Sequence, residues 1–196
     1  MKKFWVIGFL VIVITALAVV AYEVITVDPF FHYHAPDIDA YFYPLNNQRS
    51  QNDGISRHFD YEGLITGTSM TENFKTSEAE ALFDFRFIKV PYAGATYNEI
   101  NYSLTAAASH NQKLKYIIRG LDMYMFFDDS GRWRTELGSY PTYLYDDNWF
   151  NDAEYVFNRD VLFSRVYPML KEHDSPDFIG GITTFEIGRA SCRERV

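Results

Sequence analysis

The hydrophobic pattern begins with one long apolar run. Residues 4–22 carry no charge and are rich in Val, Ile, Leu, Ala and Phe. At about 1.5 Å of rise per residue, a helix of this length just spans a hydrocarbon core of roughly 30 Å. Because Lys2 and Lys3 precede the run, we expect the N-terminus in the cytoplasm and everything after Tyr22 outside it. The alternative is a cleaved signal peptide, which also exports the rest of the chain.

In the middle of the chain, short apolar runs alternate with helical patterns. The runs at residues 61–66, 85–90 and 115–121 predict three strands. The residues between them, 70–83 and 94–111, predict helices. Strands that alternate with helices indicate right-handed crossovers and a mostly parallel sheet. We therefore expect an α/β fold: an incomplete three-layer flavodoxin-like parallel sheet preceded by one N-terminal transmembrane helix.

The remaining segments have weaker patterns. Residues 27–44 are aromatic and punctuated by proline, which predicts an extended segment near the membrane surface. Residues 45–54 are polar and rich in turn-forming side chains, which predicts a loop. Residues 149–173 predict a helix, with Pro168 as a kink near its end.

The C-terminal residues 186–196 read EIGRASCRERV, which is the in-frame translation of a common short-read sequencing adapter. We interpret them as a non-native, adapter-derived tail. The expected organisation is then a membrane anchor at residues 1–26, an extended juxtamembrane segment at 27–54 and a partial α/β domain at 55–185.

Charge and cysteine content narrow the classes of partner. The formal net charge is −8, and this acidic balance argues against nucleic acid. The only cysteine, Cys192, lies in the adapter-derived tail, so we expect no disulfide in the domain.

The most informative polar residues follow the first predicted strand. Gly67, Thr68 and Ser69 stand where the strand ends and the next helix is predicted to begin. Active sites in open α/β sheets gather at this edge, and Gly67 permits a tight turn that exposes a hydroxyl. The alternative is that Thr68, Ser69 or Thr71 only caps the helix.

Three features in order resemble the SGNH (GDSL-like) hydrolase superfamily. Gly67, Thr68 and Ser69 match the block that carries the nucleophilic serine, and Gly94 matches the glycine whose N–H helps to form the oxyanion hole. After the third strand the family carries G-x-N-D, whose Asn is a second donor. This sequence has Asp122 at that position, and an ionised carboxylate cannot donate. Asn98 is a candidate substitute donor.

With its single anchor, the chain looks most like the branch near the D-alanyl-lipoteichoic acid biosynthesis and alginate acetylation proteins. The resemblance implies an extracytoplasmic esterase or acyltransferase with Ser69 as nucleophile, acting on a cell-wall polymer or polysaccharide, with a membrane acyltransferase as a further partner. It implies no cofactor. The family's D-x-x-H pair is not found at any of the histidines, so we expect the base beyond residue 185. The alternative is a non-catalytic envelope protein that binds or assembles polymers on the same fold.

His32 and His34 suggest a metal site, and the alternative is that they pack among aromatic side chains. In an extended segment the two imidazoles point the same way, but the only further ligands nearby are Asp28, Asp37 and Asp39. A zinc site needs three or four ligands. We therefore predict no metal.

Overall fold

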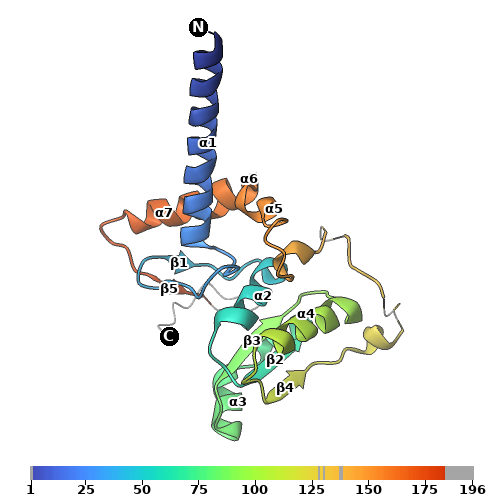
Figure 1. Ribbon diagram of the computed structural model, residues 1–196. Coiled ribbons are helices and arrows are strands. Elements are labelled where there is room, and N and C mark those ends of the chain that lie inside the picture. The colour runs from blue at the N-terminus through green and yellow to red at the C-terminus, as the bar shows by residue number, and fades with distance from the viewer. Residues whose placement is uncertain (1, 128, 130, 137–138, 184–196) are drawn as a thin grey trace.

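The computed structural model describes residues 2–127, 129, 131–136 and 139–183; residues 186–196, which we interpret as an adapter-derived tail, lie outside them. The chain has a mixed α/β fold with one long apolar N-terminal helix (Figure 1). The helices are α1 (Lys2–Val27), α2 (Gln48–His58), α3 (Thr76–Phe83), α4 (Tyr97–His110), α5 (Ala153–Val156), α6 (Arg159–Val161) and α7 (Tyr167–His173). Shorter helical turns are η1 (Ser69–Asn73), η2 (Met123–Phe126), η3 (Thr142–Leu144) and the π-helical η4 (Leu162–Val166).

The three predicted strands form one parallel sheet, which confirms the α/β rhythm of the sequence. Its members are β2 (Gly63–Gly67), β3 (Phe87–Pro91) and β4 (Tyr116–Arg119), in the order β3-β2-β4. Adjacent residues of β2 point into different clusters: Leu64 joins the main core with Ile100 of α4, whereas Ile65 packs with Ala79 of α3. The sheet is therefore covered on both faces, as expected for short parallel strands.

The helix predicted at residues 94–111 is α4, and it begins at Tyr97 after a capping residue, Thr96. The Thr96 hydroxyl accepts a hydrogen bond from the Glu99 N–H, and the Glu99 carboxylate accepts one from the Thr96 N–H. This reciprocal capping box satisfies two backbone donors at the start of α4.

Two predicted elements were wrong. The expected helix at residues 70–83 is broken into η1 and α3, because Phe74 and Lys75 are extended. The Lys89 ammonium donates to the carbonyls of Glu72 and Phe74, which holds the break open. The loop expected at residues 45–54 was also wrong, because α2 begins at Gln48. For the same reason the extended segment expected at 27–54 does not continue beyond the start of α2.

Helix α2 forms because its polar side chains bond to distant backbone. The Asn47 side chain caps it by accepting from the Ser50 N–H. Gln51 donates to the carbonyls of Pro29 and Pro44, and Asn52 donates to that of Pro91. These buried amides join residues 29–44, α2 and β3 into one body.

The C-terminal region is helical in pieces. Residues 149–152 form turns, α5 ends at Val156, and a continuous run through α6, η4 and α7 follows. The π-helical stretch ends two residues before Pro168, whose ring nitrogen cannot donate to the preceding turn. After α7 the chain returns to pair β5 (Gly181–Ile182) in parallel with β1 (Phe42–Tyr43).

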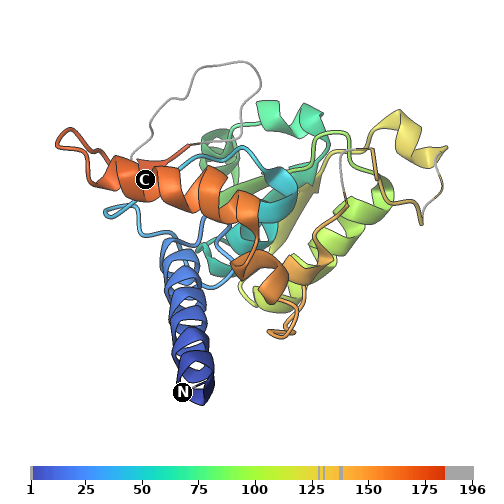
Figure 2. The same cartoon turned by 90° about the horizontal axis from the view of Figure 1, so that it is seen from above.

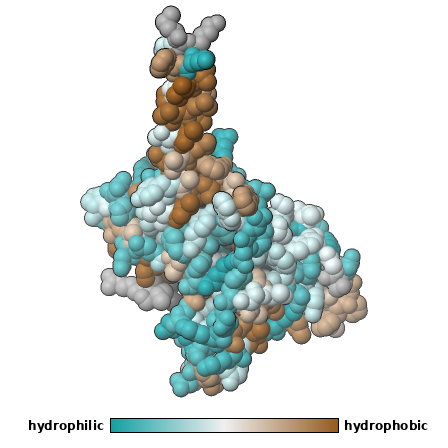
Figure 3. Space-filling view, viewed as in Figure 1, coloured by the Kyte–Doolittle hydropathy of each residue, from teal (hydrophilic) through white to brown (hydrophobic). Residues whose placement is uncertain are grey.

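Helix α1 projects from the domain, and its exposed apolar surface contrasts with the largely hydrophilic body (Figure 3). It is long and apolar enough to span a membrane. Only its last turns are covered: Val24 and Val27 are fully buried, and the helix packs against α5 and η4.

Candidate functional site

The predicted site residues lie at one edge of the sheet. Strands β2, β3 and β4 run in parallel, so the turns that follow them meet at their carboxyl ends. Backbone bonds continue past the strands: the Tyr92 N–H donates to Gly67 and the Gly120 N–H donates to Thr66. Ser69, Gly94 and Asp122 each lie two residues after one of these bonded positions, namely Gly67, Tyr92 and Gly120.

Gly67 is required by crowding at this edge. Its φ is +153°, a conformation that L side chains rarely adopt, and an added Cβ would lie 2.6 Å from the Thr71 methyl group. The same Cβ would lie 3.2 Å from the backbone of Gly120. Because Gly67 has no side chain, the chain segments that follow β2 and β4 can pass close to each other beyond the sheet.

Ser69 is partly exposed at the start of η1. Within the described residues its hydroxyl makes no hydrogen bond, and neither its own N–H nor that of Gly94 meets an acceptor. No side chain caps η1, so the capping alternative does not account for Thr68 or Ser69. The turn is only five residues long, which makes the expected helix-dipole contribution small.

Gly94 is held by contacts on its carbonyl side. Its φ is +62°, and its carbonyl accepts from Arg134 Nη1 at 2.6 Å. The neighbouring Ala93 N–H donates to Gln48 Oε1 at 2.6 Å, and Gln48 Nε2 donates to Glu72 at 2.6 Å. Gln48 therefore links the turns after β2 and β3, a role hidden from sequence analysis by the prediction of a loop at 45–54.

Asp122 faces the serine-bearing turn. The Thr68 hydroxyl donates to Asp122 Oδ2. The carboxylate thus stands where the resemblance expects an Asn donor, but it acts as an acceptor. Asn98 donates to the Gly131 carbonyl at 3.4 Å, so its amide is engaged outside this edge.

Arg119 is a residue that the sequence analysis missed. It ends β4, with its guanidinium carbon 4.3 Å from the centre of the Tyr97 ring. Its Nε and Nη2 are buried without a hydrogen-bond partner in the part of the chain that the structure describes. The only sequence signal was a cation at the end of an apolar run, residues 116–118, directly before Gly120.

The histidines lie elsewhere. His32 faces Asp152 at 3.1 Å, and the two ring nitrogens of His34 lie 2.7 and 2.9 Å from the carbonyls of Ala35 and Ile25. The other three histidines each lie next to a backbone carbonyl. His58 lies next to that of His32, His110 next to that of Ala106, and His173 next to that of Ala40. Among the described residues, no histidine contacts Ser69, and no group of three His, Cys, Asp or Glu could hold a metal.

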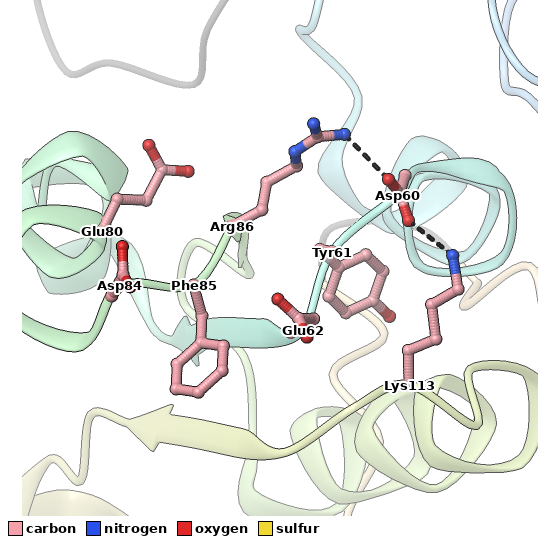
Figure 4. Close-up of a pocket in the computed structure, with 8 residues that line it drawn as sticks. All are labelled: Asp60, Tyr61, Glu62, Glu80, Asp84, Phe85, Arg86 and Lys113. Atoms are coloured by element: carbon pink, nitrogen blue, oxygen red, sulfur yellow. Dashed lines mark hydrogen bonds and ion pairs between the residues drawn. The ribbon is translucent and has the colours of Figure 1, made fainter.

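A hollow of about 650 Å³ lies at the opposite edge of the sheet (Figure 4). Its lining includes Glu62 and Arg86, which precede β2 and β3. Asp60 lies between Arg86 and Lys113, 2.9 Å from each. The side chains of these ion pairs are more than half exposed, and exposed ion pairs contribute little to stability. We therefore interpret the hollow as a solvated polar surface.

No family model matches the chain, and the comparisons with curated proteins and with solved structures found no significant match.

Proposed function

We propose that this chain is a membrane-tethered, SGNH-like esterase or acyltransferase with a three-layer flavodoxin-like sheet, and that it acts on a cell-envelope polymer. One observation carries the proposal. Ser69 follows β2 with a free hydroxyl, and the unengaged N–H groups of Ser69 and Gly94 lie at the same sheet edge. Free backbone donors beside a nucleophile are the elements of an oxyanion hole.

The proposed chemistry is acyl transfer. Ser69 Oγ forms a bond to the carbonyl carbon of an acyl ester while its proton passes to a histidine base. The N–H groups of Ser69 and Gly94 stabilise the tetrahedral oxyanion. The ester C–O bond then breaks, and the alcohol leaves with that proton. Water or a polymer hydroxyl takes the acyl group in the second half of the reaction.

The proposed location is the cell membrane, with α1 as a single span and the domain outside the cytoplasm. The proposed partners are the envelope polymer and a membrane acyltransferase. The apolar surface of α1 supports the span, and Lys2 and Lys3 at its start support this orientation.

A second candidate is a non-catalytic protein that binds or assembles envelope polymers on the same fold. Two observations favour it. Asp122 accepts from Thr68 where the resemblance expects an amide donor, and no described histidine contacts Ser69. The two candidates differ in whether a base exists after residue 185.

The test uses the full-length protein expressed from the complete native gene and treated with a fluorophosphonate probe. We expect a D-x-x-H pair after residue 185, labelling of the wild type, and loss of labelling in Ser69→Ala. Ser77→Ala, at an exposed serine of α3, should label like the wild type. No labelling of the wild type, or a complete gene without D-x-x-H, would favour the binding protein. Unchanged labelling of Ser69→Ala would contradict the assignment of Ser69 as the nucleophile.

A further inference from the structure

Large aromatic side chains are exposed close to the base of α1. Trp149 and Phe150 are 71% and 74% exposed and stand just before α5. Phe163 and Tyr167 are 61% and 59% exposed and lie on η4 and α7. Side chains of this size are normally covered in a soluble protein, and a group of exposed ones marks an interaction surface.

The segments that carry these residues adjoin the proposed membrane span. The end of α1 packs against both α5 and η4. The run from α6 to α7 crosses the axis of α1 at its base in two perpendicular views (Figures 1 and 2). If α1 crosses a bilayer, this run lies along the plane of its surface.

The exposed face of the run has the composition of an interfacial helix. Arg159, Phe163, Tyr167 and Lys171 recur every four residues and are all exposed. Val166 and Met169 are buried in the core on the other side. Two aromatic rings between two cations match the headgroup region, where rings sit at the water interface and cations meet anionic lipid.

We propose that this face, together with Trp149 and Phe150, lies on the bilayer surface that α1 enters. We assign this surface to lipid because α5 and η4 pack against the end of α1, whose apolar side chains are exposed. The inference rests on the proposed membrane span. It adds a second contact that would hold the domain in one orientation against the membrane, whereas a single helix would leave it free to tilt.

The native tryptophans provide the test, because the sequence has only three: Trp5, Trp133 and Trp149. Full-length protein is placed in nanodiscs of phosphatidylcholine and phosphatidylglycerol, with acyl chains brominated or not. With Trp5→Phe and Trp133→Phe, the emission of Trp149 should be lower in brominated lipid. With Trp133→Phe and Trp149→Phe, quenching of Trp5 reports whether α1 is inserted.

The two failures are distinguishable. Quenched Trp5 with unquenched Trp149 overturns the surface contact and leaves the anchor. Unquenched Trp5 overturns both. Since Trp133 packs on Tyr102 and Tyr140, a variant with Trp149→Phe alone gives a second measurement. Its quenched fraction should fall below that of the wild type, and an unchanged fraction also overturns the contact.

A matched pair of variants separates this face from exposed apolar residues in general. In the protein that keeps only Trp149, Phe163→Ser should reduce the quenching. Leu82→Ser should leave it unchanged, although Leu82 is 80% exposed, because α3 lies at the far end of the molecule from α1 (Figure 1). Equal effects of the two substitutions would contradict the proposal.

Discussion

At the junction with the end of α1, a buried carboxylate accepts as many hydrogen bonds as its oxygen atoms can accept. At the edge where β2, β3 and β4 end, by contrast, several hydrogen-bond donors have no acceptor among the described residues. Asp28 is fully buried and accepts from the N–H groups of His32, Tyr33 and His34 and from the Tyr155 hydroxyl, at 2.7–3.1 Å. At the sheet edge, the backbone donors of Ser69 and Gly94 and the guanidinium of Arg119 have no acceptor within the described residues.

This difference distinguishes residues that stabilise the fold from residues that are available to bind a ligand. A saturated buried group contributes to stability, because removing it leaves its partners without water or protein to bond. An unsatisfied donor does not stabilise the fold, and burying it without an acceptor costs free energy that a bound ligand could recover. Substitutions at the junction should therefore reduce stability, and those at the edge should spare it.

The largest expected effect is at Asp28. Asp28→Ala removes the acceptor of four donors, so the free energy of unfolding should fall by at least about 3 kcal/mol. Asp39→Ala, at an exposed carboxylate of the same segment, should change it by less than about 0.5 kcal/mol. Chemical denaturation of both variants in detergent, followed by circular dichroism, measures the difference. Similar losses would break the contrast between the two regions.

A smaller effect should appear at Asp53 as a dependence on pH. Burial raises the pKa of Asp53 from its ordinary value of 3.8 to about 6, against the opposing effect of Arg57, whose Nε donates to it at 2.5 Å. The native state therefore holds a proton that the unfolded chain releases above pH 4. Stability from this group is present below that pH and is lost as the pH rises to about 6, by up to about 2–3 kcal/mol.

Asp53→Asn should remove this slope between pH 4 and pH 6, and unfolding curves across the window would show it. Asp39→Asn is the control for loss of one negative charge and should keep the slope of the wild type. A stability difference between the wild type and Asp53→Asn that stays constant through this window would contradict the assignment to Asp53.

The smallest expected change is at the edge. Arg119→Met removes an unpaired guanidinium and keeps packing against Tyr97, so the free energy of unfolding should stay within about 1 kcal/mol of the wild type. Arg57→Met, which breaks pairs with Asp53 and Asp147, should cost about 3 kcal/mol in the same assay. A large loss at Arg119 would place that guanidinium with the structural groups.

The sequence could predict the sheet and its edge because their signals are local. Apolar runs separated by helical spacing define β2, β3 and β4, and Thr96 with Glu99 marks the start of α4. Parallel strands then bring Ser69, Gly94 and Asp122 to one edge without further information.

The rest depends on contacts between residues far apart in the chain. Helix α2 has a polar surface that is buried by bonds to Pro29 and Pro91, 22 and 39 residues away. The break before α3 is held by Lys89, which lies on another strand. The local sequence of each region gives no information about these distant partners. For this reason the loop at 45–54 and the continuous helix at 70–83 were predicted wrongly.

The pairing of β1 with β5 has a consequence for folding order. It closes a loop across most of the domain: the Leu45 N–H donates to the Thr183 hydroxyl, 138 residues away. During synthesis β1, which follows α1 in the chain, stays unpaired until that distant segment emerges, and such non-local closure is slow. The junction with α1 should therefore be the last part of the described chain to become protected from proteases after translation.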